Sequence, residues 1–485
     1  MSAWRRLSAL LAALGVCVAC GSQGGPPAAP SAAPPGSGLS LPSVTSTSPS
    51  ASASAAGGVR PAGDWLTYHG DAARSGYVPS GPDPQSPAVA WQARLDGKVY
   101  ASPVISRGLV VAATEGGSLY GLEATTGAVR WRTHLADALP GDSLPCGNID
   151  PIGITGTPAV DPATGSVYAV STGAAPGGGV QHVLWTVDGV SGAIQAQRPV
   201  DPAGVDPATH LQRGALLLAG GTVYVAYGGN YGDCGQYLGR VVGVPATGPG
   251  PLTEFAVPST REGGIWAPAG PALLPGGDVL VTTGNGEALG GVWDHSDSIL
   301  RLNPQLQLRD GFAPAGWAQE NSEDADLGST GPILLPDATR VIAAGKGGHV
   351  YLADTAALGG VGGQRAELDD CESYGGGAAA PVTGGGVVAY VPCANGLLQV
   401  RVPTPDQLVR GWQAPSQITG SPVVVGTTVW SLQQDGVLDA LDAGTGQMRA
   451  TVSVGDATRF ATPAVSGNAL YLPTNRGVTA VRIAP

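Results

Sequence analysis

Four short stretches of this 485-residue chain carry side chains that could do chemistry. They are GGIWAPAGPALL (263–274), VTTGNGE (281–287), SEDADLGST (322–330) and GKGGHVYLAD (345–354), and the candidate residues in them are Trp266, Asn285, Asp324 and Lys346. An indole can stack on a flat conjugated ring, and an amide oxygen suits a hard cation. A carboxylate can accept a proton from a hydroxyl, and an ammonium can polarise a carbonyl. What the four residues do together depends on whether the fold brings them to one place.

Each of these residues also has a purely structural explanation. Trp266 could seal one structural unit against the next, and Asn285 could be a turn residue with positive φ. Asp324 stands close to three other acidic residues and could belong to a solvated loop. Lys346 lies between glycines and could occupy a hairpin turn. A choice between the two explanations requires the fold.

An internal repeat predicts that fold. SLYGLEATTGAVRW (118–131) nearly returns as VLDALDAGTGQMRA (437–450), and a small-Pro-apolar phrase such as GTPAV (156–160) occurs seven times. A variant without proline, RGALLL (213–218), fills the one long gap and gives an eighth start. The starts are roughly 40 to 60 residues apart, which is the range of propeller blades.

Each start is followed by an apolar strand, a Gly-rich turn, an alternating strand, a turn that is often Thr-Gly, and a closing strand. One such four-stranded sheet cannot cover both of its faces, whereas eight arranged radially cover one another. The sequence therefore predicts an all-β protein, an eight-bladed β-propeller of four-stranded antiparallel blades. A tandem of β-sandwiches is the alternative, but it gives no reason for the shared Thr-Gly phrase.

The last repeat ends at Ile483, one strand short of a full unit. AVAWQARL (88–95) precedes the first start and has the character of a spare closing strand. We expect this N-terminal strand to complete the last blade, so that the two ends of the chain clasp the ring and leave only short edges exposed.

Composition agrees with many short strands and excludes one class of partner. The chain has 77 Gly and 42 Pro but only 12% charged residues, against about 25% in an average protein. Its net charge is −12, and it contains no run of five or more basic residues. A phosphate backbone is bound mainly by Lys and Arg, so we expect no nucleic-acid partner.

The first residues are typical of an export signal. Arg5 and Arg6 precede an apolar run, Leu7 to Ala19, that is too short to span a bilayer as a mature helix. The following CVACGS resembles the bacterial lipoprotein box, with Cys17 where Leu is usual. The resemblance implies that residues 1–20 are a lipoprotein signal peptide ending at a lipidated Cys20. Simple cleavage after Ala19 is the alternative.

Residues 21–60 are almost entirely Ala, Ser, Pro, Gly and Thr. Such a tract cannot bury enough apolar surface to offset its ordering entropy, so we expect a disordered tether. The tether would hold the propeller domain, residues 61–485, away from a cell membrane on its extracytoplasmic side.

Four further cysteines, Cys146, Cys234, Cys371 and Cys393, form an even set. In an oxidising compartment this predicts two disulfides. Cys371 with Cys393 is the easier pairing because the two are one hairpin apart, and Cys146 would then pair with Cys234. Buried free thiols remain the alternative.

The phrase Y-x-L-x-x-x-T-G-x-x-x-W at 120–131 resembles the tryptophan-docking repeat of the quinoprotein propeller superfamily. That superfamily contains the pyrroloquinoline quinone (PQQ) dehydrogenases and a non-catalytic outer-membrane assembly lipoprotein. Trp131 and Trp412 match the docking tryptophan, and DWLTYHGDAARSGY (64–77) resembles the lead-in of such proteins. The resemblance covers about residues 64–485.

The resemblance implies a role for each candidate residue. Trp266 would be the floor on which PQQ stacks, and Lys346 would touch the quinone oxygens. Asn285 would bind calcium, with Asp233 as the nearest match to an acidic ligand. Asp324 would be the catalytic base, although the family's Trp before it is Glu323 here.

Two functions follow as expectations. The first is an exported, lipid-anchored, monomeric binding or scaffold module at the cell envelope, with a vestigial cofactor funnel, no required cofactor, and an envelope protein or glycan as partner. The second is a PQQ- and calcium-dependent quinoprotein dehydrogenase that acts on an alcohol or a sugar.

Overall fold

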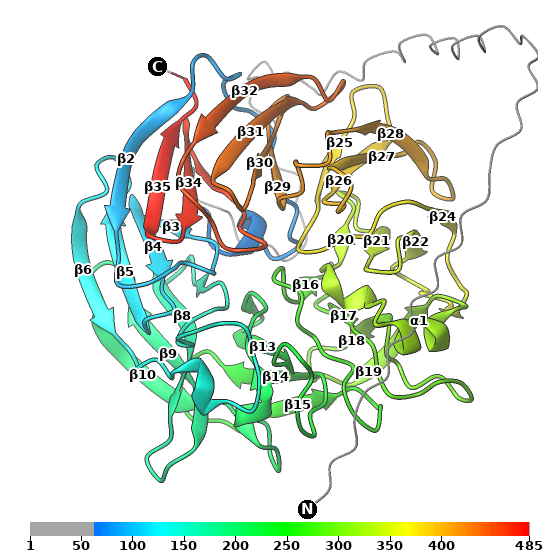
Figure 1. Cartoon of the computed structure of the whole chain (residues 1–485), viewed down its shortest axis with the longest axis horizontal. Helices are drawn as coiled ribbons and strands as arrows, with labels where there is room; N and C mark the ends of the chain where they lie inside the picture. The colour runs from blue at the N-terminus through cyan, green and yellow to red at the C-terminus, as the bar shows by residue number, and fades with distance from the viewer. Residues whose placement is uncertain (1–62, 485) are drawn as a thin grey trace, which may run out of the picture. The chain divides into compact units, whose positions relative to one another are not determined.

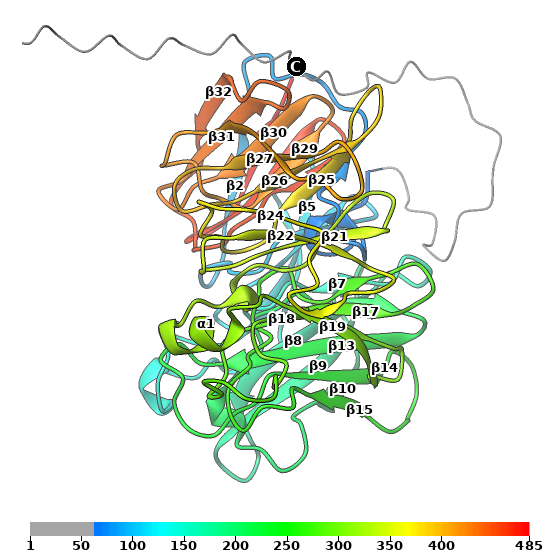
Figure 2. The same cartoon turned by 90° about the vertical axis from the view of Figure 1, so that its right-hand side faces the viewer.

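The computed structural model describes residues 63–484, and the predictions for the signal peptide, Cys20 and the tether at 21–60 fall outside that range. The described residues form eight sheets, each with at least four strands, arranged in a ring (Figure 1). This confirms the predicted eight-bladed β-propeller. Among residues 63–484 one α-helix occurs, α1 (Trp317–Glu323), and it lies outside the sheets (Figure 2).

The blades follow one another in sequence order. The first four are blade 1, with β3 (Val104–Ser106), β4 (Leu109–Ala113), β5 (Ser118–Glu123) and β6 (Val129–His134); blade 2, with β7 (Ala159–Val160), β8 (Ser166–Ala174), β9 (Val180–Asp188) and β10 (Ile194–Pro199); blade 3, with β12 (Leu217–Ala219), β13 (Thr222–Gly229), β14 (Arg240–Pro245) and β15 (Thr253–Ala256); and blade 4, with β16 (Ala272–Leu273), β17 (Val279–Thr283), β18 (Ser298–Leu302) and β19 (Leu308–Ala313).

The last four blades repeat the pattern. They are blade 5, with β20 (Ile333–Leu334), β21 (Arg340–Ala344), β22 (Val350–Asp354) and β24 (Ala366–Leu368); blade 6, with β25 (Ala378–Pro381), β26 (Val387–Val391), β27 (Leu398–Val402) and β28 (Val409–Gln413); blade 7, with β29 (Pro422–Val425), β30 (Thr428–Leu432), β31 (Val437–Asp442) and β32 (Met448–Ser453); and blade 8, with β33 (Ala464–Ser466), β34 (Ala469–Thr474), β35 (Gly477–Arg482) and β2 (Ala88–Arg94).

Short elements lie between or beside the blades. The remaining strands are β1 (Tyr77–Val78), β11 (His210–Leu211) and β23 (Gly360–Val361), and the 3-10 helices are η1 (Tyr68–Gly70), η2 (Gly141–Ser143), η3 (Pro207–Thr209) and η4 (Leu327–Ser329). Within the described range, no helix has both the length and the apolar character needed to cross a membrane.

The ring is closed by strands from its two ends. β2 pairs antiparallel with β35, from Ala88 opposite Arg482 to Arg94 opposite Gly477. In Figure 1 the two strands lie side by side, one blue and one red. The prediction that residues 88–95 complete the last blade is therefore confirmed. A register shift between Val89 and Trp91 bends this strand.

Three tryptophans join neighbouring blades in the same way. Trp131 lies over Gly192 of the next blade and donates its indole N–H to the Gly189 carbonyl at 3.2 Å. Trp412 does the same with Gly446 and the Ala443 carbonyl at 3.0 Å. This shared geometry explains why a Thr-Gly or Ser-Gly turn recurs in the blades, since each glycine has positive φ and leaves room for the ring.

The third tryptophan of this kind is Trp91 in β2, which sequence reasoning did not assign. Its ring lies over Gly127 of blade 1, and its indole N–H donates to the Ala124 carbonyl at 3.0 Å. The closing strand therefore does more than complete blade 8, because it also docks that blade onto blade 1.

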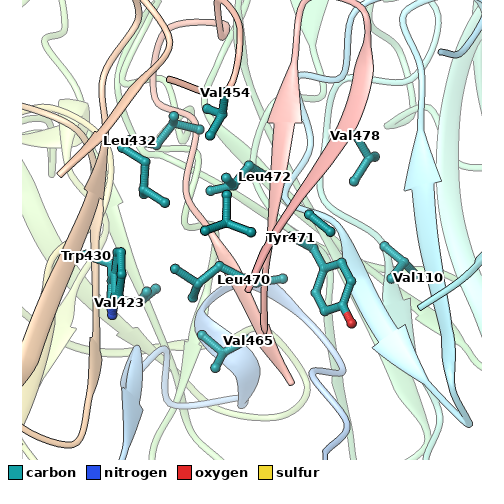
Figure 3. Packing of buried hydrophobic residues seen from close by; sticks show 14 of the residues in the cluster. Val110, Val423, Trp430, Leu432, Val454, Val465, Leu470, Tyr471, Leu472 and Val478 are labelled. Carbon is teal, nitrogen blue, oxygen red and sulfur yellow. The ribbon is translucent and has the colours of Figure 1, made fainter. Parts of the chain in front are cut away.

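Apolar side chains fill the spaces between blades. The largest cluster of buried residues joins blades 1, 7 and 8, and it includes Trp430, Leu470, Leu472 and Val110 (Figure 3). Another cluster joins blades 5 and 6 and contains the Cys371–Cys393 disulfide, both of whose cysteines are fully buried. One predicted cysteine pair is thus confirmed.

The lead-in segment, residues 64–78, ties several blades together from the middle of the ring. Trp65 bridges to Ile105 of blade 1, and β1 runs parallel to β29 of blade 7. Between them lies Arg74, which is 1% exposed. Its guanidinium donates to the Leu216 and Pro271 carbonyls, both at 3.0 Å, and so links blades 3 and 4.

Replacing Gly127 with alanine should weaken the seam between blades 8 and 1. An added Cβ would lie 2.5 Å from the Trp91 ring, at a residue whose φ is +71°. We expect the free energy of unfolding to fall by about 2 to 3 kcal/mol, from overpacking and backbone strain together. Chemical denaturation followed by tryptophan fluorescence would measure the loss.

Gly467→Ala is the matched control, because Gly467 has a φ of +59° but no atom within 4 Å of the added Cβ. It should cost only about 1 kcal/mol of backbone strain. Equal losses in the two variants would show that the contact with Trp91 is unimportant.

Candidate functional site

A cavity of about 500 Å³ opens where loops of blades 2 to 6 and blade 8 meet, and we call it the central cavity. All five residues predicted to bind a cofactor or metal or to act in catalysis line it: Asp233, Trp266, Asn285, Asp324 and Lys346. Another cavity, of about 510 Å³, lies at the closure of blade 8 and contains none of them. The central cavity is therefore the candidate site, and the roles of its residues remain predictions.

Trp266 stands in the cavity wall. Its backbone packs against Gly228, which has no side chain to keep it away, and its ring is half-buried. The ring centroid lies 6.2 Å from that of Phe460, and the Lys346 ammonium lies 5.8 Å from the ring centroid. An indole in this position presents an apolar surface to a ligand in the cavity.

Asn285 follows β17 almost directly and is held from both sides. Its backbone N–H donates to Oδ1 of Asp326 at 2.8 Å, and its carbonyl accepts the Gly263 N–H at 2.7 Å. Its side-chain amide donates to Oε2 of Glu262 at 3.4 Å. Asn285 is not among the residues with positive φ, so the alternative explanation as a left-handed turn residue is wrong.

Lys346 pairs with two carboxylates at once. Its Nζ lies 2.7 Å from Oδ1 of Asp324 and 2.6 Å from Oδ2 of Asp326. Burial alone would lower the pKa of Lys346, but the two carboxylates hold that pKa above its ordinary value. Lys346 does lie in the turn between β21 and β22, so its structural explanation holds together with its place in the cavity.

The two aspartates differ in environment. Asp324 ends α1 with φ at +54°, and its side chain is 66% exposed. Asp326 is 4% exposed, and burial raises the pKa of its carboxyl, while the Lys346 ammonium opposes that rise. Sequence reasoning named Asp324 and passed over Asp326, although both stand in SEDADLGST and the second directly precedes the buried Leu327.

Asp233 and its loop form another part of the wall. The Tyr237 hydroxyl donates to Oδ1 of Asp233 at 2.5 Å, and Asp233 has a φ of +51°. The adjacent Cys234 is bonded to Cys146, so the second predicted disulfide is confirmed. It ties this loop to the one that carries Asn148 and Ile149, which also line the cavity.

Glu262 is a buried acid beside the cavity that sequence reasoning missed. It is 8% exposed, pairs with Arg261 and accepts the Asn285 amide. Burial raises the pKa of Glu262, and Arg261 opposes the rise. The only signal in the sequence is its place four residues before Trp266, which by itself indicates no chemistry.

The cavity suits a flat acidic cofactor better than it suits calcium. It has the volume, the aromatic wall and, in Lys346, Arg213 and Arg459, cationic side chains for an acid. Hard oxygen donors are also present in Asp233, Glu262 and Asn285. However, both oxygens of Asp326 already accept bonds, and the ammonium of Lys346 would repel a divalent cation there. Asp326 is therefore not available as a calcium ligand while it is paired with Lys346.

Comparison with known proteins gives one family. A family model described as outer membrane protein assembly factor BamB matches residues 74–294. No curated protein sequence matches the chain.

Solved structures share the fold at low identity. A quinohemoprotein alcohol dehydrogenase, ADHIIG from Pseudomonas putida HK5, is 14% identical with a TM-score of 0.62, over 87% of this chain and 80% of that chain. A europium-containing methanol dehydrogenase is 14% identical with a TM-score of 0.65, over 84% and 89%. BamB from Moraxella catarrhalis is 17% identical with a TM-score of 0.54, over 81% and 99%.

Lys346→Met should destabilise the protein in a pH-dependent way. The variant leaves Asp326 buried without a counter-charge, which should cost about 3 kcal/mol of unfolding free energy at pH 7. Burial raises the pKa of Asp326 in the folded state, so the folded variant binds a proton more readily than the unfolded chain. Its stability is then greatest at low pH and falls as pH rises, so the deficit should be smaller at pH 4 than at pH 7. Urea denaturation at the two pH values would measure it.

The double variant Lys346→Met/Asp326→Asn provides the control. It removes both charges and should recover most of the loss at pH 7. A deficit that is independent of pH and is not rescued by the second substitution would show that the ion pair is not its cause.

Proposed function

Because the chain belongs to the PQQ-binding-like β-propeller family, we propose that it is a cell-envelope binding module whose central cavity holds a ligand without turning it over. Its partner is an envelope protein or glycan that contacts the loops of the blades. The family contains both kinds of protein, so the choice between binding and catalysis depends on the site itself.

The observation that supports binding over catalysis is the ion pair of Asp324. A general base must reach a substrate hydroxyl, and it works best where water is excluded. Asp324 is instead 66% exposed, and its Oδ1 is engaged by Lys346 at 2.7 Å. Asp326, the better shielded carboxylate, is engaged by the same ammonium and by the Asn285 N–H.

The place of action is proposed from the N-terminal sequence. A lipidated Cys20 and the tether at 21–60 would hold the propeller beside a membrane on its extracytoplasmic side. The two disulfides support an oxidising compartment, because such bonds persist there and are rare in the cytosol.

Cys20→Ser should move the protein from the membrane fraction to the soluble exported fraction. The substitution removes the thiol that would carry the lipid, and Cys20 lies outside the described residues 63–484 that form the propeller. Fractionation of cells and immunoblotting would measure the distribution, with Cys17→Ser as the matched control. Retention of both variants in the membrane would rule out an anchor at Cys20.

Asp324→Asn should leave the binding function intact. Cross-linking in membranes, followed by mass spectrometry, should recover the same partner with the variant as with the parent protein. The purified parent protein, incubated with PQQ and calcium, should reduce no dye when an alcohol or a sugar is added. Turnover that disappears in Asp324→Asn would overturn the binding proposal and favour an enzyme.

A PQQ-dependent dehydrogenase is the second candidate, and the meeting of Trp266, Asn285, Asp324 and Lys346 in one cavity favours it. In this reading the cofactor would supply the acceptor for hydride from an alcohol or a sugar. Trp266 would stack against it, Lys346 would donate to its oxygens, and Asp324 would accept the hydroxyl proton.

A further inference from the structure

A buried arginine lines the central cavity and has no carboxylate partner. Arg213, just ahead of β12, is 5% exposed, and within residues 63–484 no acidic side chain forms an ion pair with it. Its guanidinium donates to the Thr155 carbonyl at 3.1 Å and more weakly to the Arg459 carbonyl at 3.5 Å. Burial lowers its pKa to about 10, so it remains charged at neutral pH. A buried charge without a counter-charge is costly.

Arg74 is also buried, but its guanidinium uses its hydrogen-bond donors within the protein. Arg74 also has no ion pair, but its guanidinium donates to Thr67 Oγ1 and to the carbonyls of Tyr68, Leu216 and Pro271. Those four bonds give it a structural role, and it does not line the central cavity. Among residues 63–484, Arg213 donates only the two hydrogen bonds given above, which leaves donors of its guanidinium for a group in the cavity.

A second guanidinium stands beside the first. Arg459, between β32 and β33, lines the same cavity, and no carboxylate in the described part of the chain pairs with it. Its Cζ lies 4.6 Å from the Tyr374 ring centroid and 4.9 Å from that of Phe460, and these two rings are stacked at 6.2 Å. The aromatic contacts fix the direction of the guanidinium without using its hydrogen-bond donors.

The charges around the cavity are segregated. Asp233, Asp324 and Asp326 lie on loops of blades 3, 4 and 5, where Lys346 balances only part of their charge. Arg213 and Arg459 stand at the entries to blades 3 and 8, and the rings of Trp266 and Phe460, which also line the cavity, lie 6.2 Å apart and are tilted by 55°. An anionic group in the cavity would therefore be attracted to the arginines and repelled by the aspartates.

We infer that Arg213 and Arg459 form an oxyanion site, which binds a carboxylate group of a ligand whose flat ring contacts the aromatic wall of Phe460 and Trp266. This inference deepens the proposed binding function by giving the chemical class of the ligand. The carboxylate could belong to a quinone cofactor or to a free organic acid, since guanidinium recognises both in the same way.

Matched flat probes test the site. Benzene-1,3,5-tricarboxylate presents three carboxylates on a ring, and the corresponding triamide has the same shape without charge. Calorimetry with the purified protein should show binding of the tricarboxylate, which weakens as salt is added, and at least tenfold weaker binding of the triamide. Absence of tricarboxylate binding at millimolar concentration, or equal binding of the two probes, would overturn the inference.

Arginine variants locate the site. Arg459→Gln and Arg213→Gln should each weaken tricarboxylate binding by about tenfold, the effect of losing a charge-assisted hydrogen bond. Arg476→Gln removes the same charge at the other large cavity and should leave the affinity unchanged. Arg459 is exposed, so its variant keeps the test decisive if Arg213→Gln fails to fold. Unchanged affinity in Arg459→Gln would contradict the assignment.

PQQ itself, titrated in a separate experiment, distinguishes the two sources of the carboxylate. If PQQ binds and competes with the tricarboxylate, a quinone acid is the source; if only the tricarboxylate binds, the source is a free organic acid. Failure of the proposed function would appear instead as dye reduction or as loss of the cross-linked partner, and neither result depends on the affinity for these probes.

Discussion

The pairing of β2 with β35 is the interaction on which the rest of this structure depends. A radial set of sheets is stable only when the last meets the first, because a gap would expose an unpaired strand edge and an apolar blade face. This chain closes the gap with a strand made at one end and a hairpin made at the other. The same strand delivers Trp91 to blade 1, so hydrogen bonds and side-chain packing close the ring at one place.

The architecture could be predicted because its signal is repeated. A Thr-Gly turn and a small-Pro-apolar phrase that recur along the chain indicate equal units, and a unit one strand short points to the spare strand at 88–95. The prediction relied on that repeat, and the docking role of Trp91 was missed because Trp91 lies outside it. Trp131 follows the Thr-Gly phrase of its own blade, whereas Trp91 precedes every copy of that phrase, so its role exists only once the ring is closed.

The site was predictable where its residues sit in recognisable phrases and was missed elsewhere. Trp266, Asn285, Asp324, Lys346 and Asp233 line one cavity, as their phrases suggested. Glu262, Asp326, Arg213 and Arg459 belong to the same site or border it, but each depends on a partner that is distant in sequence. Burial and the lack of a counter-charge are properties of the assembled loops, and no local pattern in the sequence reports them.

The pairing of β2 with β35, two strands far apart in the sequence, also sets an order of events during synthesis. Ala88 is translated 394 residues before its partner Arg482. Until then the first closing strand has no place to pair, and blades 1 and 8 cannot meet. The ring of the nascent chain must therefore stay open until the β34–β35 hairpin has emerged, so the apolar faces of blades 1 and 8 remain uncovered for most of synthesis.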